Sequence, residues 1–176
     1  MIVLTRISSI NLKNNRMDKL EYIPGDLVMT NGIPIGTKKG IIYQVTESNP
    51  DKYRPVEDRN SFTELKGSVT LSNIKGKTVH DEGFLFGDCG AWVKDIVPIP
   101  LTSDILEKNG WKKEKYHDWY MLPLERTLLY LVEGTGIDGA WSVCVGLNMS
   151  NIASISFIHQ LQHLLFGLGM DSSMIV

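Results

Sequence analysis

The chain has 176 residues, 43% of them hydrophobic and 22% charged, with a formal net charge of −2 at pH 7. This length suits one domain or two small ones with a real core, and the composition is typical of a globular protein. The slight negative charge excludes a bulk positive field that would draw the whole chain onto nucleic acid or anionic lipid, but not a local basic patch. Two cysteines, Cys89 and Cys144, are too few for a disulfide framework and favour free, buried thiols over a single bridge.

The first residues, MIVLTRISSINLKNNRMDKL, open with only four apolar residues and then become polar. A secretory signal needs an apolar stretch of about 7 to 15 residues, and a membrane-spanning helix needs about 20. We read neither pattern in the sequence and therefore expect a cytoplasmic protein with no membrane partner. Residues 1–19 are expected to form a flexible leader, with a docked arm or an upstream start site as the alternatives.

Residues 20–98 are predicted to form a β-rich module. Five short apolar stretches, most of them separated by glycine turns, are LVMT (27–30), IIYQVTE (41–47), SVTLS (68–72), FLF (84–86) and AWVKDIV (91–97). Strands of this length and spacing predict a small barrel or sandwich of the SH3-like kind. The polar stretch SNPDKYRPVEDRNS (48–61) contains two prolines and is expected to be a long exposed loop.

A stiff connector is predicted to end the first module. Pro98 and Pro100 each hold the preceding residue in an extended conformation. Thr102 or Ser103 can then cap a short helix, which Gly110 would close.

Residues 99–176 are predicted to form a small α+β module. After the short helix, three aromatic or β-branched stretches at 116–122, 127–133 and 140–147 are typical of antiparallel strands. A last helix is expected at about 153–168. The predicted fold class is therefore α+β, with a second module in the order helix, three strands, helix.

The last helix carries two histidines, His159 and His163, four positions apart in FIHQLQHLLF. This spacing resembles the zinc motif H-E-x-x-H, but Gln160 stands where the motif has its catalytic glutamate. A third ligand would have to come from His117, Asp118 or Asp171. On a helical wheel the leucines lie opposite the histidines, so we expect His159, Gln160 and His163 to face solvent or a partner. No metal and no cofactor are predicted, and a metal-binding protein or hydrolase stays an alternative.

A stretch around Cys89 is a second candidate catalytic motif. FGDCGAW (86–92) resembles the nucleophile strand of chymotrypsin-like proteases with cysteine in place of serine. The one upstream histidine, His80, is only nine residues away, which leaves no room for a first barrel. We therefore interpret Cys89 as a small thiol in a glycine-rich hairpin and predict no catalytic residue, with a Cys89–His80 dyad as the alternative.

A lysine cluster follows the short helix and is a candidate for nucleic-acid binding; its members are Lys108, Lys112, Lys113 and Lys115. The aromatic residues between and after them could stack on bases: Trp111, Tyr116 and Trp119. Acidic residues lie among them, namely Glu107, Glu114 and Asp118. A mixed solvated surface is therefore the preferred interpretation.

Two stretches together carry a resemblance to a known group. IVPIPLTSDILEKNGWKK (96–113) and FIHQLQHLLFGLGM (157–170) resemble a group of uncharacterised proteins from phages and mobile elements of Bacteroides-type bacteria. That group has a variable β-rich front half, a similar "I-x-P-I-P-L-T" connector and a closing "HQLQ" helix. The resemblance covers about the last 80 residues, where DSSMIV replaces the usual acidic ending. It implies a bacterial, cytoplasmic setting but no activity.

These observations favour a non-enzymatic accessory or binding protein of a prophage or mobile element, with an unknown protein as its partner. The alternatives are a nucleic-acid-associated protein of the element and the metal-binding protein named above.

Overall fold

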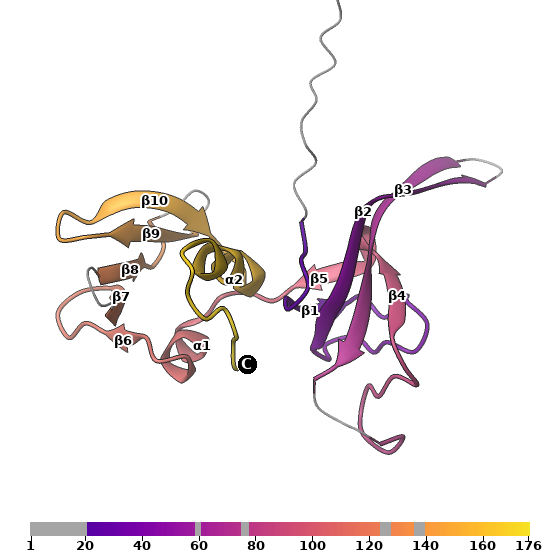
Figure 1. The fold of residues 1–176 in the computed structure, drawn as a ribbon, viewed down its shortest axis with the longest axis horizontal. Coiled ribbons are helices and arrows are strands. Elements are labelled where there is room, and N and C mark those ends of the chain that lie inside the picture. Colours follow the sequence, from indigo (N-terminus) through magenta and orange to yellow (C-terminus); the bar gives the residue numbers. More distant parts are fainter. Residues whose placement is uncertain (1–20, 59–60, 75–77, 124–127, 136–139) are drawn as a thin grey trace, which may run out of the picture.

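The computed structural model describes residues 21–58, 61–74, 78–123, 128–135 and 140–176, so the leader expected at 1–19 lies outside the described residues. The described chain forms two five-stranded antiparallel sheets and two α-helices, which confirms the α+β class. Figure 1 shows the two sheets side by side, with helix α2 lying where they meet. We refer to them as the first and second sheet in chain order.

The first sheet has the strand order β4-β3-β2-β1-β5. Its strands are β1 (Leu27–Thr30), β2 (Tyr43–Asp58), β3 (Ser61–Asn73), β4 (Cys89–Trp92) and β5 (Ile96–Pro98), with a 3-10 turn η1 (Val93–Asp95) between the last two. Barrel closure needs edge strands that meet along their length. The edge strands β4 and β5 have only four and three residues and pair at opposite edges. The sequence predicts a small barrel or sandwich, and the described sheet is open and forms no closed barrel.

The expected loop at 48–61 is wrong, because residues 48–58 belong to β2 and Ser61 begins β3. Beyond Asn49 the two strands pair only with each other, and this ribbon projects from the sheet in Figure 1. We call residues 53–58 and 61–66 the arm. Pro50 sits in a bulge between the pairs Asn49–Ser68 and Tyr53–Lys66, and Pro55 pairs with Glu64 in a part of β2 that has no neighbour on its other side. Prolines are tolerated at such edges and bulges, which is why they do not end the strand.

The second sheet has the order β10-β9-β8-β7-β6. Its strands are β6 (Lys112–Lys113), β7 (Trp119–Pro123), β8 (Leu128–Val132), β9 (Trp141–Val145) and β10 (Ser150–Ile155). The three predicted strands correspond to β7, β8 and β9, so β6 and β10 are additional. Strand β10 replaces the expected first turn of the last helix, because residues 150–155 pair with β9.

Both helices begin at capped positions. Helix α1 (Ser103–Lys108) starts as predicted after Thr102, whose hydroxyl accepts the Ile105 N–H at 3.4 Å. Helix α2 (Ile158–Gly167) begins later than expected. Within the described residues, no helix is long and apolar enough to cross a bilayer.

Strand β1 is shared between the two hydrophobic cores. Because side chains alternate along a strand, Leu27 joins the core of the second sheet, whereas Val28 joins the core of the first. Met29 again packs against the second core. The connector residues Ile99 and Leu101 are also buried there. The two sheets are thus packed together around one short strand.

We predict that Gly67→Ala destabilises the protein by roughly 1–2 kcal/mol in urea unfolding, because Gly67 has a φ of +65° that L side chains rarely adopt. A Cβ there would also lie 3.0 Å from Val93 Cγ2. Gly90→Ala is the matched control, since a Cβ at Gly90 meets no atom within 4 Å. Equal stability of the two variants would contradict the backbone geometry assigned to Gly67.

Candidate functional site

The histidine face of α2 is covered by the chain's own first module. His159 is only 6% exposed and Gln162 only 4%, and both lie against the segment that leads into β1. The expectation that this face meets solvent or a partner is therefore wrong for His159. The helical wheel correctly placed the leucines opposite the histidines, and Leu161 and Leu165 are buried in the core. The prediction failed for His159 because the first module covers that side of α2 as well.

Gln162 joins the two modules through its side-chain amide. Its Oε1 accepts the Leu27 N–H at 3.0 Å, and its Nε2 donates to the Gly25 carbonyl at 3.1 Å and to the Ser172 carbonyl at 3.2 Å. One side chain thereby satisfies backbone groups from two distant segments. Sequence reasoning did not assign Gln162 a role, and its position between the histidines was the only available signal.

His163 pairs with a buried carboxylate from the first module. Its Nε2 lies 2.8 Å from Asp26 Oδ2, and Asp26 is only 1% exposed. The same carboxylate oxygen accepts the Ile23 N–H at 2.8 Å. A buried carboxylate is costly unless it is paired and hydrogen-bonded, and both partners are present here. We refer to Tyr22, Asp26, His159, Gln162 and His163 as the polar joint.

His159 is a buried member of the polar joint that is surrounded by aromatic rings. Its ring centroid lies 4.9 Å from that of Tyr22 and 5.8 Å from that of His163, and the ring stacks on Phe157 at 5.9 Å. Its Nδ1 is buried without a hydrogen-bond partner. Burial lowers the pKa of His159, the Asp26 carboxylate opposes this effect, and His163 adds to it. The His159 ring is therefore neutral at pH 7. Burial also raises the pKa of the neighbouring Tyr22 hydroxyl.

Gln160 has a structural task at the start of α2. Its Oε1 accepts the N–H of Ser156 at 2.7 Å and that of Phe157 at 3.1 Å. These backbone groups precede the first turn and would otherwise lack helix partners. The amide that replaces the glutamate of the zinc motif therefore stabilises the helix terminus through its oxygen.

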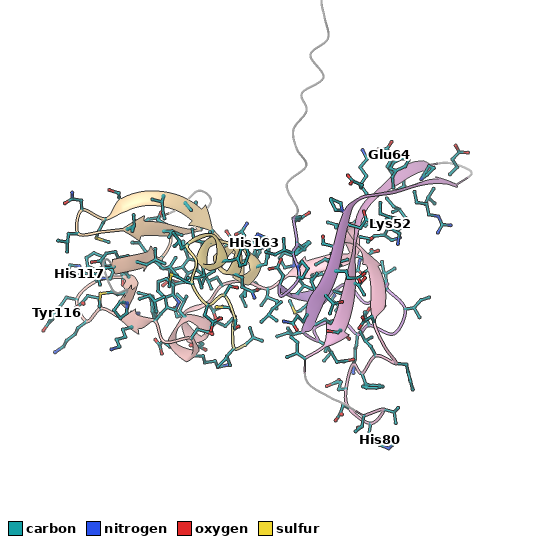
Figure 2. All side chains as sticks on the ribbon, viewed as in Figure 1. Lys52, Glu64, His80, Tyr116, His117 and His163 are labelled. Carbon is teal, nitrogen blue, oxygen red and sulfur yellow. The ribbon has the colours of Figure 1, made fainter. Side chains whose placement is uncertain are left out.

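Of the residues considered as further metal ligands, His117 lies apart from the histidine pair. His117 stacks on Trp119 with ring centroids 4.0 Å apart, on the far side of the second sheet from His163 (Figure 2). Asp171 accepts the Ser173 N–H at 2.9 Å. Within the described ranges, no group of three or more His, Cys, Asp or Glu side chains is placed to hold a metal ion.

Cys89 and His80 are not brought together as a dyad. The Cys89 thiol donates to the Ile35 carbonyl at 2.6 Å, and burial raises its pKa. His80 is exposed in the loop that hangs below the first sheet in Figure 2. A thiol whose pKa is raised is a poor nucleophile at neutral pH. The protease-like stretch therefore has a structural role where the chain enters β4.

The lysine cluster is divided, because Lys108 is the last residue of α1, whereas Lys112, Lys113 and Lys115 lie in or just after the edge strand of the second sheet. Lys112 and Lys113 form β6, and Lys113 Nζ lies 5.7 Å from the Tyr120 ring. Lys115 Nζ lies 5.3 Å from the ring of Tyr116, which is 77% exposed. Trp111 is only 3% exposed, so it is a core residue and cannot stack on a base.

The structure adds a surface that sequence reasoning missed, at the base of the arm. A hollow of about 430 Å³ lies there, lined in part by Lys52, Tyr53, Arg54 and Trp92. Lys52 Nζ lies 5.4 Å from the Trp92 ring centroid. The signal was the run KYR at 52–54, which lay in the segment assigned to a loop.

Comparison of the chain with protein-family models, curated proteins and solved structures finds no match.

We predict that Gln162→Ala lowers the free energy of unfolding by about 2 kcal/mol, because the buried Leu27 N–H loses its acceptor. Urea unfolding measures this loss. Gln44→Ala, at an exposed position of β2, is the control and should change stability by less than about 0.5 kcal/mol. A Gln162 variant as stable as the control would show that the hydrogen bonds of Gln162 contribute nothing to the free energy of unfolding.

We also predict that the protein loses stability between pH 7.5 and 5.5 in part through His159. Its pKa is lowered in the folded state, so the unfolded chain, with a histidine pKa of about 6.5, binds more protons as the pH falls. Stability is thus fully present above this value and declines below it. His159→Phe should flatten the decline in thermal melting. His80→Gln, at an exposed histidine, should retain it, and equal slopes for all three proteins would refute this assignment.

Proposed function

We propose that this chain is a non-enzymatic binding protein and that the arm is its partner-contacting surface. The carrying observation is that the arm leaves the first sheet and contributes to neither hydrophobic core. A two-stranded ribbon on its own is marginally stable in water. It nevertheless exposes Tyr53 by 50% and Val56 by 37%, and both side chains would be better buried against a partner.

The state of the reactive side chains supports a binding role over catalysis. Among the described residues, His159 is buried at the polar joint, His163 is paired with Asp26, and the Cys89 thiol has a raised pKa. Of these three groups, Cys89 lines a hollow of the first sheet, and the acidic residue beside it there is Asp88, near Phe86.

The cellular setting is part of the same proposal. We infer, from the connector and the closing helix, a protein of a prophage or mobile element of Bacteroides-type bacteria that acts in the cytoplasm. We also propose that the first module is an opened sheet of the SH3-like kind.

A nucleic-acid-associated role through the second sheet is the second candidate. It is favoured by the exposed ring of Tyr116 beside Lys115 and by the exposed lysines of β6. The acidic residues Glu114 and Asp118 nearby weaken it.

We predict that a partner recovered from a bacterial extract by the tagged full chain depends on the arm. A Tyr53→Ala, Val56→Ser variant should recover about 5- to 30-fold less of it, because central exposed aromatics carry much of the binding energy of an interface. Quantitative mass spectrometry, with and without nuclease, measures the recovery.

Tyr116→Ala, which removes an even more exposed ring from the second module, is the matched control and should recover wild-type amounts. A folded arm variant that retains every partner would refute the proposed surface. Loss of the partner only in the Tyr116 variant would favour the second candidate.

A further inference from the structure

The hollow at the base of the arm differs in chemistry from the rest of the arm. Two cations, Lys52 and Arg54, and two aromatic rings, Tyr53 and Trp92, line it, and no carboxylate does. Over residues 51–66 the sequence has four acidic and four basic side chains, so this stretch as a whole is neutral. The positive character is therefore local to the point where the arm leaves the sheet.

One carboxylate of the arm, that of Glu64, is already neutralised. Glu64 accepts a hydrogen bond from the Tyr53 hydroxyl at 3.1 Å and pairs with Lys66 at 2.7 Å. Its charge is thus matched by Lys66, and the positive charges of Lys52 and Arg54 remain available to a ligand. Figure 2 shows Lys52 on the body side of the arm and Glu64 farther out.

The floor of the hollow is open enough for a flat ligand. Gly90 lies in it, and a Cβ at that position would meet no atom within 4 Å. Trp92 is half-buried and holds Lys52 Nζ 5.4 Å from its ring centroid. The ammonium lies over the ring, so a planar group that stacks on the same face of the indole must displace it. Tyr53 is 50% exposed at the same hollow.

We propose that this hollow binds single-stranded nucleic acid, a refinement that rests on the proposed binding role of the arm. Bases stack on Trp92 and Tyr53, and phosphates pair with Lys52 and Arg54. A flat aromatic platform beside cations suits a chain in which planar and anionic groups alternate. An acidic peptide would use the cations alone, and a duplex would need a broader positive face than this neutral stretch provides.

The test is fluorescence anisotropy of a labelled twelve-residue oligothymidylate titrated with the full chain at 50 and 200 mM salt. The dependence of log K on log salt should have a slope of roughly −1.4 for two phosphate contacts, and about half that for Arg54→Gln. Tyr53→Leu should weaken binding at least about fivefold. Trp92→Phe should abolish a ligand-induced quenching of tryptophan fluorescence.

Lys112→Gln, which removes a cation from the second sheet, is the matched control and should bind as the wild type does. The proposal would be overturned by an absence of binding at 50 mM salt or by equal affinity for duplex. It would also be overturned if poly-glutamate at matched charge displaced the oligonucleotide, or if binding were sensitive to Lys112→Gln but not to Arg54→Gln. An extract partner that depends on Tyr53 without oligonucleotide binding would overturn this inference alone. Partner and oligonucleotide binding that are both unaffected by arm variants would overturn the proposed function as well.

Discussion

The burial of strand β1 on both faces is the constraint on which the rest of the molecule depends. Leu27 is 4% exposed and Val28 fully buried, and they belong to different cores. Full burial of one such side chain contributes about 1.5–3 kcal/mol. A strand of four residues thus supplies apolar contacts to two sheets that share no backbone pairing with each other. The connector follows the same logic, because Ile99 and Leu101 pass directly from the first sheet into the second core.

The polar joint complements this apolar contact with directional bonds. Apolar packing alone is tolerant of rotation, whereas the amide of Gln162 and the Asp26–His163 pair each accept one geometry. Removal of one member leaves a buried polar group without a partner, which is the costly case. The joint therefore fixes the orientation of α2 against the segment before β1. The unpartnered Nδ1 of His159 is the one imperfection in this arrangement among the described side chains.

Local signals in the sequence predicted the elements that depend on neighbours along the chain. The Thr102 cap and three strands of the second sheet were predicted because each depends on local propensity and alternation. The arm was not, since Pro50 and Pro55 are typical of loops unless a partner strand and a bulge accommodate them. The burial of His159 could not be predicted either. A helical wheel separates two faces, but it cannot show that a segment about 135 residues away covers the polar one.

The independence of the arm from both cores has a consequence for how the protein can change over evolutionary time. Stability is decided at β1, the connector and α2, where each substitution affects tightly packed side chains. Arm residues are held mainly by backbone pairing between β2 and β3, which accepts many side chains. Substitutions can therefore accumulate on the arm while the scaffold stays fixed. A lineage could change the surface chemistry of the arm without first acquiring compensating substitutions elsewhere.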